Sequence, residues 1–562
     1  MIKLTTKIMA LAMCAACIIP AVGCGGRGDG EEVDSKKSQL YIGSWNGDFQ
    51  LEWLKVMGKR FEETYADHSF EPGKTGVQVH VSEGTYVYDT FATTIANCTE
   101  EILVSEQCNY YTFVNKNTVM DITDVTTTPL TEYGETRSIA DKLTTADQDY
   151  YGVTRDGSVK YYGLPWYETY TGFMYDLQLF EDENLYFAAD GVGQNGFIVN
   201  SKTKKSNGPD GQEGTDDDGL PATYDEFFQL LDKMSELGFT PVIWGGGAQV
   251  YLNNLLSSLA ADYEGYDDMM RNYLLEGEAE VVKEIKADGT IELETVEITN
   301  ANGYELKRQA GYYYGLKFIE RLLTTKGTNG SPKYYTADST SDTFTHRAAQ
   351  SNFIRGEYAQ NVTTCGILID ATWWYSGARE TFEGMSNIPG ASANERRFGI
   401  MPMPKVDENH LGEATYFNNW VTSINIRKGI EESKVDMAKQ FVRFMHTDVS
   451  LSEFTRLTGA VRPFNYELTA EDEAIASTFA KQNINIRKNA KVVNPWSTNA
   501  LVQNNLSVFM RNDTMYTSIV GGNSYKLVSN AIRGGVSAKD YFNGLATYMS
   551  KNNWEKNFSA WF

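Results

Sequence analysis

The sequence is poor in basic residues, in histidine and in long apolar runs. Lys and Arg number 50 against 74 Asp and Glu, so the net charge is −24 and the isoelectric point about 4.7. Nucleic-acid binding requires basic patches that face the phosphates, and this balance therefore argues against a nucleic-acid partner. The five histidines stand in neither HExxH nor HxH spacing, so the sequence predicts no catalytic zinc site.

The N-terminus carries the most apolar stretch. Lys3 and Lys7 precede apolar residues 8–22, which have the length of a signal-peptide core and are short for a membrane span. Small residues then precede Cys24, and this ending resembles a bacterial lipobox with Ala21 in place of the usual leucine. We expect a lipoprotein signal peptide here, with an ordinary secretory peptide or a short helix as the alternatives.

The expected mature protein begins at the lipidated cysteine. Residues 1–23 form the expected signal peptide, Cys24 the lipidation site and residues 24–38 a polar, glycine-rich tether that we expect to be flexible. No other stretch is long and apolar enough to span a bilayer, so the lipid is the only expected membrane anchor. The expected location is the extracellular face of the bacterial cell membrane.

Three cysteines follow this leader: Cys98, Cys108 and Cys365. Their number is odd, and they contain no CxxC pair of the kind that binds a metal. A Cys98–Cys108 disulfide and buried free thiols are both compatible with the sequence.

The following residues alternate between strand and helix patterns. Residues 38–45 have strand composition, residues 51–65 place apolar side chains along one helical face, and residues 77–84 alternate valine with polar residues. This order predicts a βαβ layout and an α/β sheet. Ligand-binding loops in such folds follow the carboxyl ends of the strands, where Asp48 and residues 107–109 would lie.

Later segments extend this pattern over a chain of 562 residues, which is too long for one compact core and predicts two lobes. Thr223 and Glu226 have the spacing of a capping box at the start of a helix. Residues 276–308 are polar and alternating, which predicts an exposed hairpin.

Three aromatic residues follow a buried strand expected at residues 366–370. Trp373, Trp374 and Tyr375 cannot all enter one core, because successive side chains of a strand point to opposite faces. If the strand continues, Trp373 and Tyr375 face a cleft and Trp374 packs inside. The aromatic content of 13% agrees with some rings binding a ligand.

The order of these segments resembles the bacterial extracellular solute-binding proteins of family 1, the maltose-binding type that feeds ABC sugar importers. The matching stretches are LYIGSWNGDF, GLPWYETYTGFMYD, PATYDEFFQLLDKM, GILIDATWW and FGIMPMP. The resemblance implies an α/β, two-lobed periplasmic-binding-protein-like fold (type II), with the lobes joined by crossing strands and the ligand bound between them. The implied boundaries are residues 39–166 and 403–456 for lobe 1, residues 167–402 and 457–562 for lobe 2, and insertions near 186–219 and 261–308.

Sugar binding would use side chains of two kinds. The apolar face of a pyranose stacks on an aromatic ring, and its hydroxyls bond to planar polar groups. Carried over position by position, the resemblance implies a set of ligand-binding residues. They are Trp45, Asn46, Asp48, Trp166, Tyr167, Tyr170, Gln249, Tyr251, Trp373, Tyr375, Asn419, Trp420 and Trp496.

The segment NGPDGQEGTDDDG (207–219) places carboxylates between glycines. Carboxylate oxygens are ligands that calcium prefers, although the spacing is not that of an EF-hand. A structural calcium site is one interpretation and a solvated acidic loop is the other; no further cofactor is expected. The candidate ligands are Asp210, Glu213, Asp216, Asp217 and Asp218.

The implied function is the capture of an oligosaccharide by a monomeric, lipid-anchored receptor that delivers it to the permease subunits of an ABC importer. No catalytic residue is expected. A surface glycoside hydrolase would need two carboxylates that flank one bond, and no motif singles out such a pair. A peptide or polyamine ligand in the same fold stays open, because an acidic cleft allows it.

Overall fold

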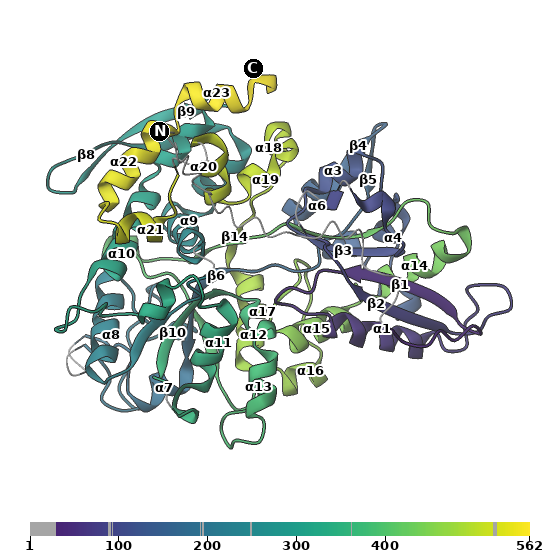
Figure 1. Cartoon of the computed structure of the whole chain (residues 1–562), viewed down its shortest axis with the longest axis horizontal. Coiled ribbons are helices and arrows are strands. Elements are labelled where there is room, and N and C mark those ends of the chain that lie inside the picture. Colours follow the sequence, from purple (N-terminus) through teal and green to yellow (C-terminus); the bar gives the residue numbers. More distant parts are fainter. Residues whose placement is uncertain are drawn as a thin grey trace, which may run out of the picture.

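The computed structural model describes residues 30–87, 91–92, 94–190, 193, 196–247, 250–360, 362–520 and 525–561. The predicted signal peptide and Cys24 lie outside these residues. The described chain forms two lobes, each built around a four-stranded sheet that is packed by helices (Figure 1). The predicted two-lobed α/β fold is confirmed.

The first sheet is built from the beginning of the described chain and one late strand. Its strands in spatial order are β13 (Thr422–Ile426), β3 (Ile102–Glu106), β1 (Ser38–Ser44) and β2 (Val77–Glu83). β1 is parallel to β2 and β3, whereas β13 is antiparallel to β3. Helix α1 (Glu52–Thr64) packs beside β2 and buries Trp53, Leu54 and Phe61, which lie on its apolar face.

The second sheet carries the strand that leads to the aromatic triplet. Its strands in spatial order are β11 (Phe398–Met401), β6 (Thr171–Asp176), β10 (Cys365–Ala371) and β7 (Thr240–Ile243). β10 is parallel to β7 and antiparallel to β6. Helix α8 (Tyr224–Glu236) begins at the predicted cap, where the Thr223 side chain accepts a hydrogen bond from the backbone N–H of Glu226.

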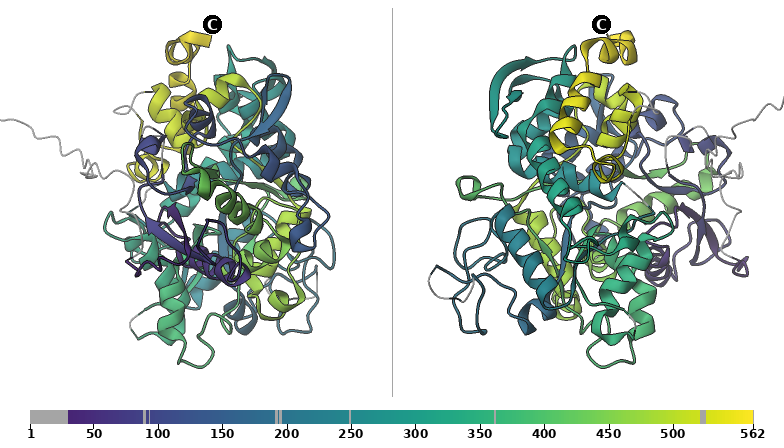
Figure 2. Two further views of the ribbon diagram at one scale, coloured as in Figure 1. Left: turned by 90° about the vertical axis from the view of Figure 1, so that its right-hand side faces the viewer. Right: turned by 60° about the vertical axis from the view of Figure 1, so that its left-hand side comes forward.

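The other strands form three pairs outside these sheets. They are β4 (Gly152–Arg155) with β5 (Ser158–Tyr161), β8 (Gly277–Ile285) with β9 (Ile291–Ile298), and β12 (Thr415–Phe417) with β14 (Lys491–Val493). The β8–β9 pair is the predicted exposed hairpin, and it projects from the second lobe beside the C-terminal helices (Figure 2).

The remaining α-helices cover the two sheets and form the C-terminal part of the second lobe. In chain order they are α3 (Tyr110–Asn115), α4 (Thr123–Thr127), α5 (Ile139–Lys142), α6 (Thr145–Tyr151), α7 (Leu177–Asp182), α9 (Tyr251–Leu274), α10 (Ala310–Thr324), α11 (His346–Arg355), α12 (Trp374–Gly377), α13 (Arg379–Met385), α14 (Glu432–Phe444), α15 (Asp448–Thr458), α16 (Ala470–Ile475), α17 (Thr478–Asn489), α18 (Ala500–Asn504), α19 (Leu506–Phe509), α20 (Asn512–Val520), α21 (Val528–Arg533), α22 (Ala538–Tyr548) and α23 (Lys551–Asn557). No helix of the described ranges has the length and apolar character that a membrane crossing requires.

Crossing segments join the lobes by backbone hydrogen bonds. The segment before β6 bonds to the segment that contains β13, where the N–H of Ile424 donates to the carbonyl of Leu164 at 2.7 Å. It also bonds to the segment after α15, where the N–H of Glu168 donates to the carbonyl of Val461 at 2.9 Å. Three crossings therefore lie side by side between the lobes.

One lobe boundary differs from the prediction. The chain was expected to return to the first lobe at residue 403. Instead Lys405 bridges to Thr223 at the start of α8, and β12 packs against α9 of the second lobe. Residues 403–417 therefore pack with the second lobe, because the returning strand of the first sheet is β13 and not β11.

The aromatic triplet does not continue a strand. β10 ends at Ala371, and Trp374 already begins the short helix α12. Trp374 is 0% exposed and its ring packs edge-on against Phe353 and Phe398. Tyr375 does not rejoin the cleft; its ring stacks on Phe479 with centroids 5.4 Å apart. The alternation argument was wrong for Tyr375, because a helix turns successive side chains by about 100°.

The structure shows the surroundings of two of the three cysteines that follow the leader. Cys365 is free and buried, and Cys108 is buried as well. Burial raises the pKa of the Cys365 thiol to about 12, which keeps it protonated and unreactive.

The burial of Trp374 gives a test of this core. We expect Trp374→Ala to lower the free energy of unfolding by about 3–5 kcal/mol, because it removes a large ring and leaves a cavity. Chemical denaturation followed by circular dichroism measures this loss. Trp561→Ala, at a tryptophan that is 37% exposed, is the control and should change it far less. A loss below about 1 kcal/mol for Trp374→Ala would contradict the core assignment.

Candidate functional site

A pocket of about 280 Å³ lies where the two lobes and two of the crossings meet. The first lobe contributes the loop after β1 and the end of β3, and the second lobe contributes the start of α11 and the residue before α12. The lining residues are Trp45, Asn46, Gly47, Asp48, Phe49, Glu106, Gln107, Tyr167, His346, Arg347, Trp373 and Trp420. Both lobes are therefore needed to complete the pocket.

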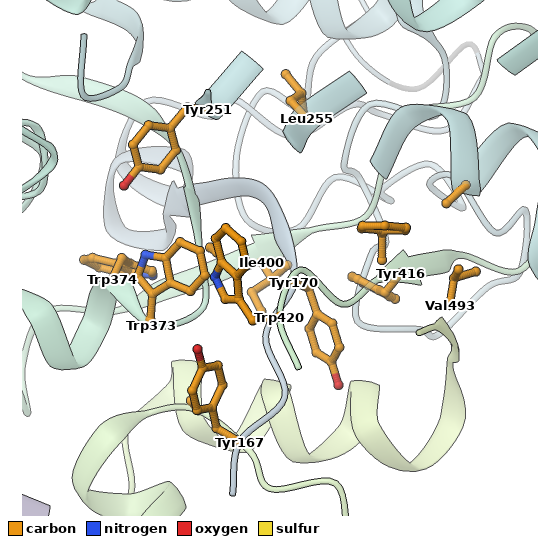
Figure 3. Close-up of a cluster of buried hydrophobic side chains, with 14 of the residues drawn as sticks. Tyr167, Tyr170, Tyr251, Leu255, Trp373, Trp374, Ile400, Tyr416, Trp420 and Val493 are labelled. Atoms are coloured by element: carbon orange, nitrogen blue, oxygen red, sulfur yellow. The ribbon is translucent and has the colours of Figure 1, made fainter. Parts of the chain in front are cut away.

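Two indole rings form an aromatic wall of the pocket. Trp373 and Trp420 are stacked with centroids 5.8 Å apart and an interplanar angle of 22° (Figure 3). Each is 7% exposed, and the guanidinium of Arg511 lies 5.0 Å from the centroid of the Trp420 ring. The wall offers flat apolar area together with a cation, which suits a ligand with one apolar face.

A buried carboxylate fixes the orientation of Trp373. The indole Nε1 of Trp373 donates to Oδ1 of Asp370 at 2.9 Å, and Gln350 donates to the other oxygen of Asp370 at 2.9 Å. Burial raises the pKa of Asp370 to about 7, and the charge of Asp48 adds to this shift. The Tyr251 side chain points toward the same indole from α9 (Figure 3). Trp373 therefore holds one orientation.

A polar bridge connects the lobes at the pocket. Oδ1 of Asp48, in the first lobe, lies 2.9 Å from Nε2 of His346, in the second. This hydrogen bond raises the pKa of His346, because the carboxylate stabilises the charged ring. A second bridge runs from the Ser376 hydroxyl to the carbonyl of Phe49 at 3.1 Å. Both bridges connect the two lobes beside the pocket.

The first lobe presents a further carboxylate. The Tyr167 hydroxyl donates to Glu106 at 2.9 Å. Burial raises the pKa of Glu106 to about 7, and the nearby charge of Asp48 contributes. A buried carboxylate of this kind accepts hydrogen bonds from ligand hydroxyls at low cost in reorganisation.

Six of the predicted ligand-binding residues line this pocket. They are Trp45, Asn46, Asp48, Tyr167, Trp373 and Trp420. Tyr251 is 5% exposed and lies behind Trp373, so it supports the wall without lining it. Gln249 lies outside the described residues.

Two predicted tryptophans are packed into cores. Trp166 is 2% exposed, stacks on Trp53 with centroids 5.3 Å apart and donates its Nε1 to the carbonyl of Ser105. Trp496 is 3% exposed and its ring packs against Tyr150 with centroids 5.5 Å apart. Neither lines the pocket, because partners from distant parts of the chain cover both rings.

Two further predicted residues, Tyr170 and Asn419, make their polar contacts inside the protein. Tyr375 does not line the pocket either, because its ring stacks on Phe479. The hydroxyl of Tyr170 donates to Glu168, and its ring packs against Tyr416. The amide of Asn419 donates to the Thr171 hydroxyl at 2.7 Å. The Tyr170–Tyr416 contact and the Asn419–Thr171 bond join neighbouring segments, so the two side chains position the crossings.

The sequence reasoning missed several lining residues. Residues 107–109 were expected in a ligand-binding loop at the end of a strand. Glu106 directly precedes them, so the prediction missed it by one position. His346 and Arg347 begin α11, and no motif marks them. Their role appears only when the lobes are brought together.

The five acidic residues of the 207–219 loop do not converge in the described structure. Glu213 pairs with Lys204 at 3.0 Å, and Asp218 accepts from the N–H of Gly214 at 2.9 Å. Asp217 accepts from Thr215 at 2.6 Å, and burial raises its pKa. Within the described ranges no group of three or more His, Cys, Asp or Glu side chains could hold a metal ion. The calcium site stays a prediction.

The family can now be stated. The family model described as bacterial extracellular solute-binding protein matches residues 58–482, which is more than half of the chain. The chain belongs to the bacterial extracellular solute-binding proteins, and the predicted resemblance is confirmed. No curated protein is significantly similar in sequence.

Solved structures show the same fold. A chitin oligosaccharide binding protein is 13% identical, with a TM-score of 0.53 over 92% of this chain and 100% of that chain. The GacH receptor of Streptomyces glaucescens, solved in unliganded form and with acarbose, is 12% identical, with a TM-score of 0.53 over 94% of this chain and 100% of that chain. A structure from a study of xylan utilization by Caldanaerobius polysaccharolyticus is 11% identical, with a TM-score of 0.53 over 91% and 100%. Likeness at this level of identity establishes the fold.

Glu106 makes the stability depend on pH. Its pKa is about 7 in the fold, against about 4.3 for an unfolded glutamate. Its contribution to stability is thus fully present below about pH 4 and is lost as the pH rises through about 7. We expect Glu106→Gln, which cannot ionise, to raise the melting temperature relative to the unaltered protein by about 2 °C more at pH 8 than at pH 5.

Thermal melts at matched ionic strength measure this difference. Glu63→Gln, at an exposed glutamate of α1, is the control. It should change the melting temperature by the same amount at pH 5 and at pH 8. A pH-independent effect of Glu106→Gln would show that this carboxyl group titrates normally.

Proposed function

We propose that the protein captures an oligosaccharide in the inter-lobe pocket and delivers it to an ABC importer. The observation that carries this proposal is the wall of Trp373 and Trp420 facing a pocket whose polar groups come from both lobes. The apolar face of a sugar ring stacks on such indoles. Structural relatives described as binding chitin oligosaccharide or acarbose, or studied for xylan utilization, support a carbohydrate ligand.

Several polar groups are suited to the hydroxyls of a sugar. Asp48 and Glu106 offer carboxylate oxygens that accept hydrogen bonds, and Arg347 and His346 offer donors. Groups of both kinds are needed because each hydroxyl can donate one hydrogen bond and accept others. Ligand binding would hold together the two lobes that the Asp48–His346 bridge already connects.

The same proposal includes the anchor and the partner. The protein would act outside the cell as a monomer, attached to the membrane through the lipid on Cys24, and would dock on the permease subunits of the importer. Its acidic charge leaves nucleic acid out of the proposal. No covalent step on the ligand is proposed, so the protein should leave glycans unchanged.

Trp373 is the side chain whose removal tests this function. We expect Trp373→Ala to weaken glycan binding at least tenfold, because the ring supplies the stacking surface. A glycan array on the protein without its leader and tether finds the ligand class, and calorimetry then measures the dissociation constant. Tyr548→Ala, at a tyrosine that is 45% exposed and outside the pocket, is the control and should bind like the unaltered protein.

Three results would contradict this function. Binding of peptides or polyamines alone would exclude a sugar ligand, and cleaved glycans would indicate an enzyme. Unaltered binding by Trp373→Ala would exclude the indole wall as the site.

The loop at residues 207–219 is proposed to hold a structural calcium ion, which would add to stability and not to the pocket. Support comes from the positive φ angles of Gly208, Gly211 and Gly214, which turn the chain tightly around Asp217. We expect calcium to raise the melting temperature over that in a chelator, and Asp217→Asn to remove the difference. Asp67→Asn, at an exposed aspartate elsewhere, should keep it. Equal midpoints in calcium and chelator would exclude the site.

A further inference from the structure

The pocket between the lobes is small for an oligosaccharide. Its volume of about 280 Å³ lies just below the range of about 300–1,000 Å³ in which pockets enclose ligands of several rings. Trp373 and Trp420 stack on each other at 5.8 Å, so a sugar ring cannot enter between them. The enclosed space therefore suits one pyranose ring laid against the indole wall.

The crossing segments contribute Tyr167 and Trp420 to the pocket, and the neighbouring residues of these segments are fully buried. Thr169, Tyr170 and Asn418 of these segments are each at most 1% exposed. The β-bridge between Tyr170 and Asn418 and the hydrogen bond from Asn419 to Thr171 join two of these segments side by side. A second sugar unit has no path in the direction of these segments unless these pairings break.

The exposed residues mark the mouth. Among the twelve lining residues, only Asn46 and Arg347 are exposed, and they come from opposite lobes. They are the near neighbours in sequence of Asp48 and His346, whose 2.9 Å contact bridges the lobes. The pocket therefore opens beside this bridge, between one amide and one guanidinium.

Arg347 can take part in binding at the mouth. Among the described residues no carboxylate forms an ion pair with its guanidinium and no hydrogen bond occupies its side-chain N–H groups. The exposed guanidinium presents five N–H donors in a planar fork, which suits adjacent hydroxyls of a sugar. Arg347, at the mouth of the pocket, can therefore recognise the sugar unit that follows the one held inside the pocket.

We propose that the protein binds its oligosaccharide by one end. The terminal ring is enclosed against Trp373, the second unit passes between Asn46 and Arg347, and all further units lie in solvent. This inference rests on the proposed function and names the ligand class more closely: chains with a free end, recognised over two units. Arg347 is the residue that distinguishes a chain from a single sugar.

Calorimetry with oligosaccharides of increasing length tests this arrangement. The probes are malto-, cello-, xylo- and chito-oligosaccharides of one to five units, each measured with the full chain after removal of the leader. For a series that binds, we expect the affinity to rise about three- to tenfold from one unit to two and then to stay within about twofold up to five units, because later units make no contact.

Two variants sharpen the test. Arg347→Ala should reduce the gain in affinity from one unit to two, whereas Trp373→Ala should weaken every length alike. Arg379→Ala, at an arginine of α13 that is partly exposed, pairs with Glu383 and lies outside the pocket, is the matched control and should keep the gain. Circular dichroism and melting temperatures verify that all three variants fold.

The outcomes separate this inference from the proposed function. A tenfold or greater increase from two to four units, or a full gain in Arg347→Ala, would overturn binding by one end while leaving a sugar receptor intact. Failure of every series and every length to bind would contradict the proposed function itself, and this inference with it.

Discussion

The pairing of the crossing segments is the constraint on which the rest of the molecule depends. The strands of the second sheet lie between the strands of the first sheet in the sequence. The first sheet is completed by β13, which follows all four strands of the second. The backbone hydrogen bonds between Leu164 and Ile424 and between Glu168 and Val461 fix the relative position of the two sheets. Tyr167 and Trp420 lie on these same segments, so the residues that join the lobes also line the pocket.

Charge organises the pocket as much as the aromatic wall does. Asp48 bonds to a histidine of the other lobe, and its negative charge adds to the raised pKa values of Glu106 and Asp370. Glu106 and Asp370 are thus harder to ionise, because both are buried and both lie near the charge of Asp48.

Much of the fold could be predicted from local patterns. The helix of residues 52–64, the strand of residues 77–83 and the hairpin of residues 277–298 follow from periodicity, which depends only on neighbouring residues. The order of such segments was enough to predict two lobes. The boundary at residue 403 was wrong, because strand pairing across hundreds of residues leaves no local signal.

The candidate site could be predicted only in part. Trp373 was placed in a cleft because it follows the end of a buried strand, and the pocket contains it. Trp166 and Trp496 were predicted from the same resemblance, yet each is covered by partners from distant segments that the sequence does not reveal. His346 carried no motif at all, since its contact with Asp48 spans 298 positions.

The stacked indoles also give the protein a built-in optical signal. Two chromophores with ring centroids 5.8 Å apart and nearly parallel planes are close enough for their electronic transitions to couple. The guanidinium over Trp420 adds a charge to the same ring system. Anything that parts the rings or moves that charge changes the near-ultraviolet circular dichroism and the emission of the pair, so occupancy of the pocket can be followed without a label.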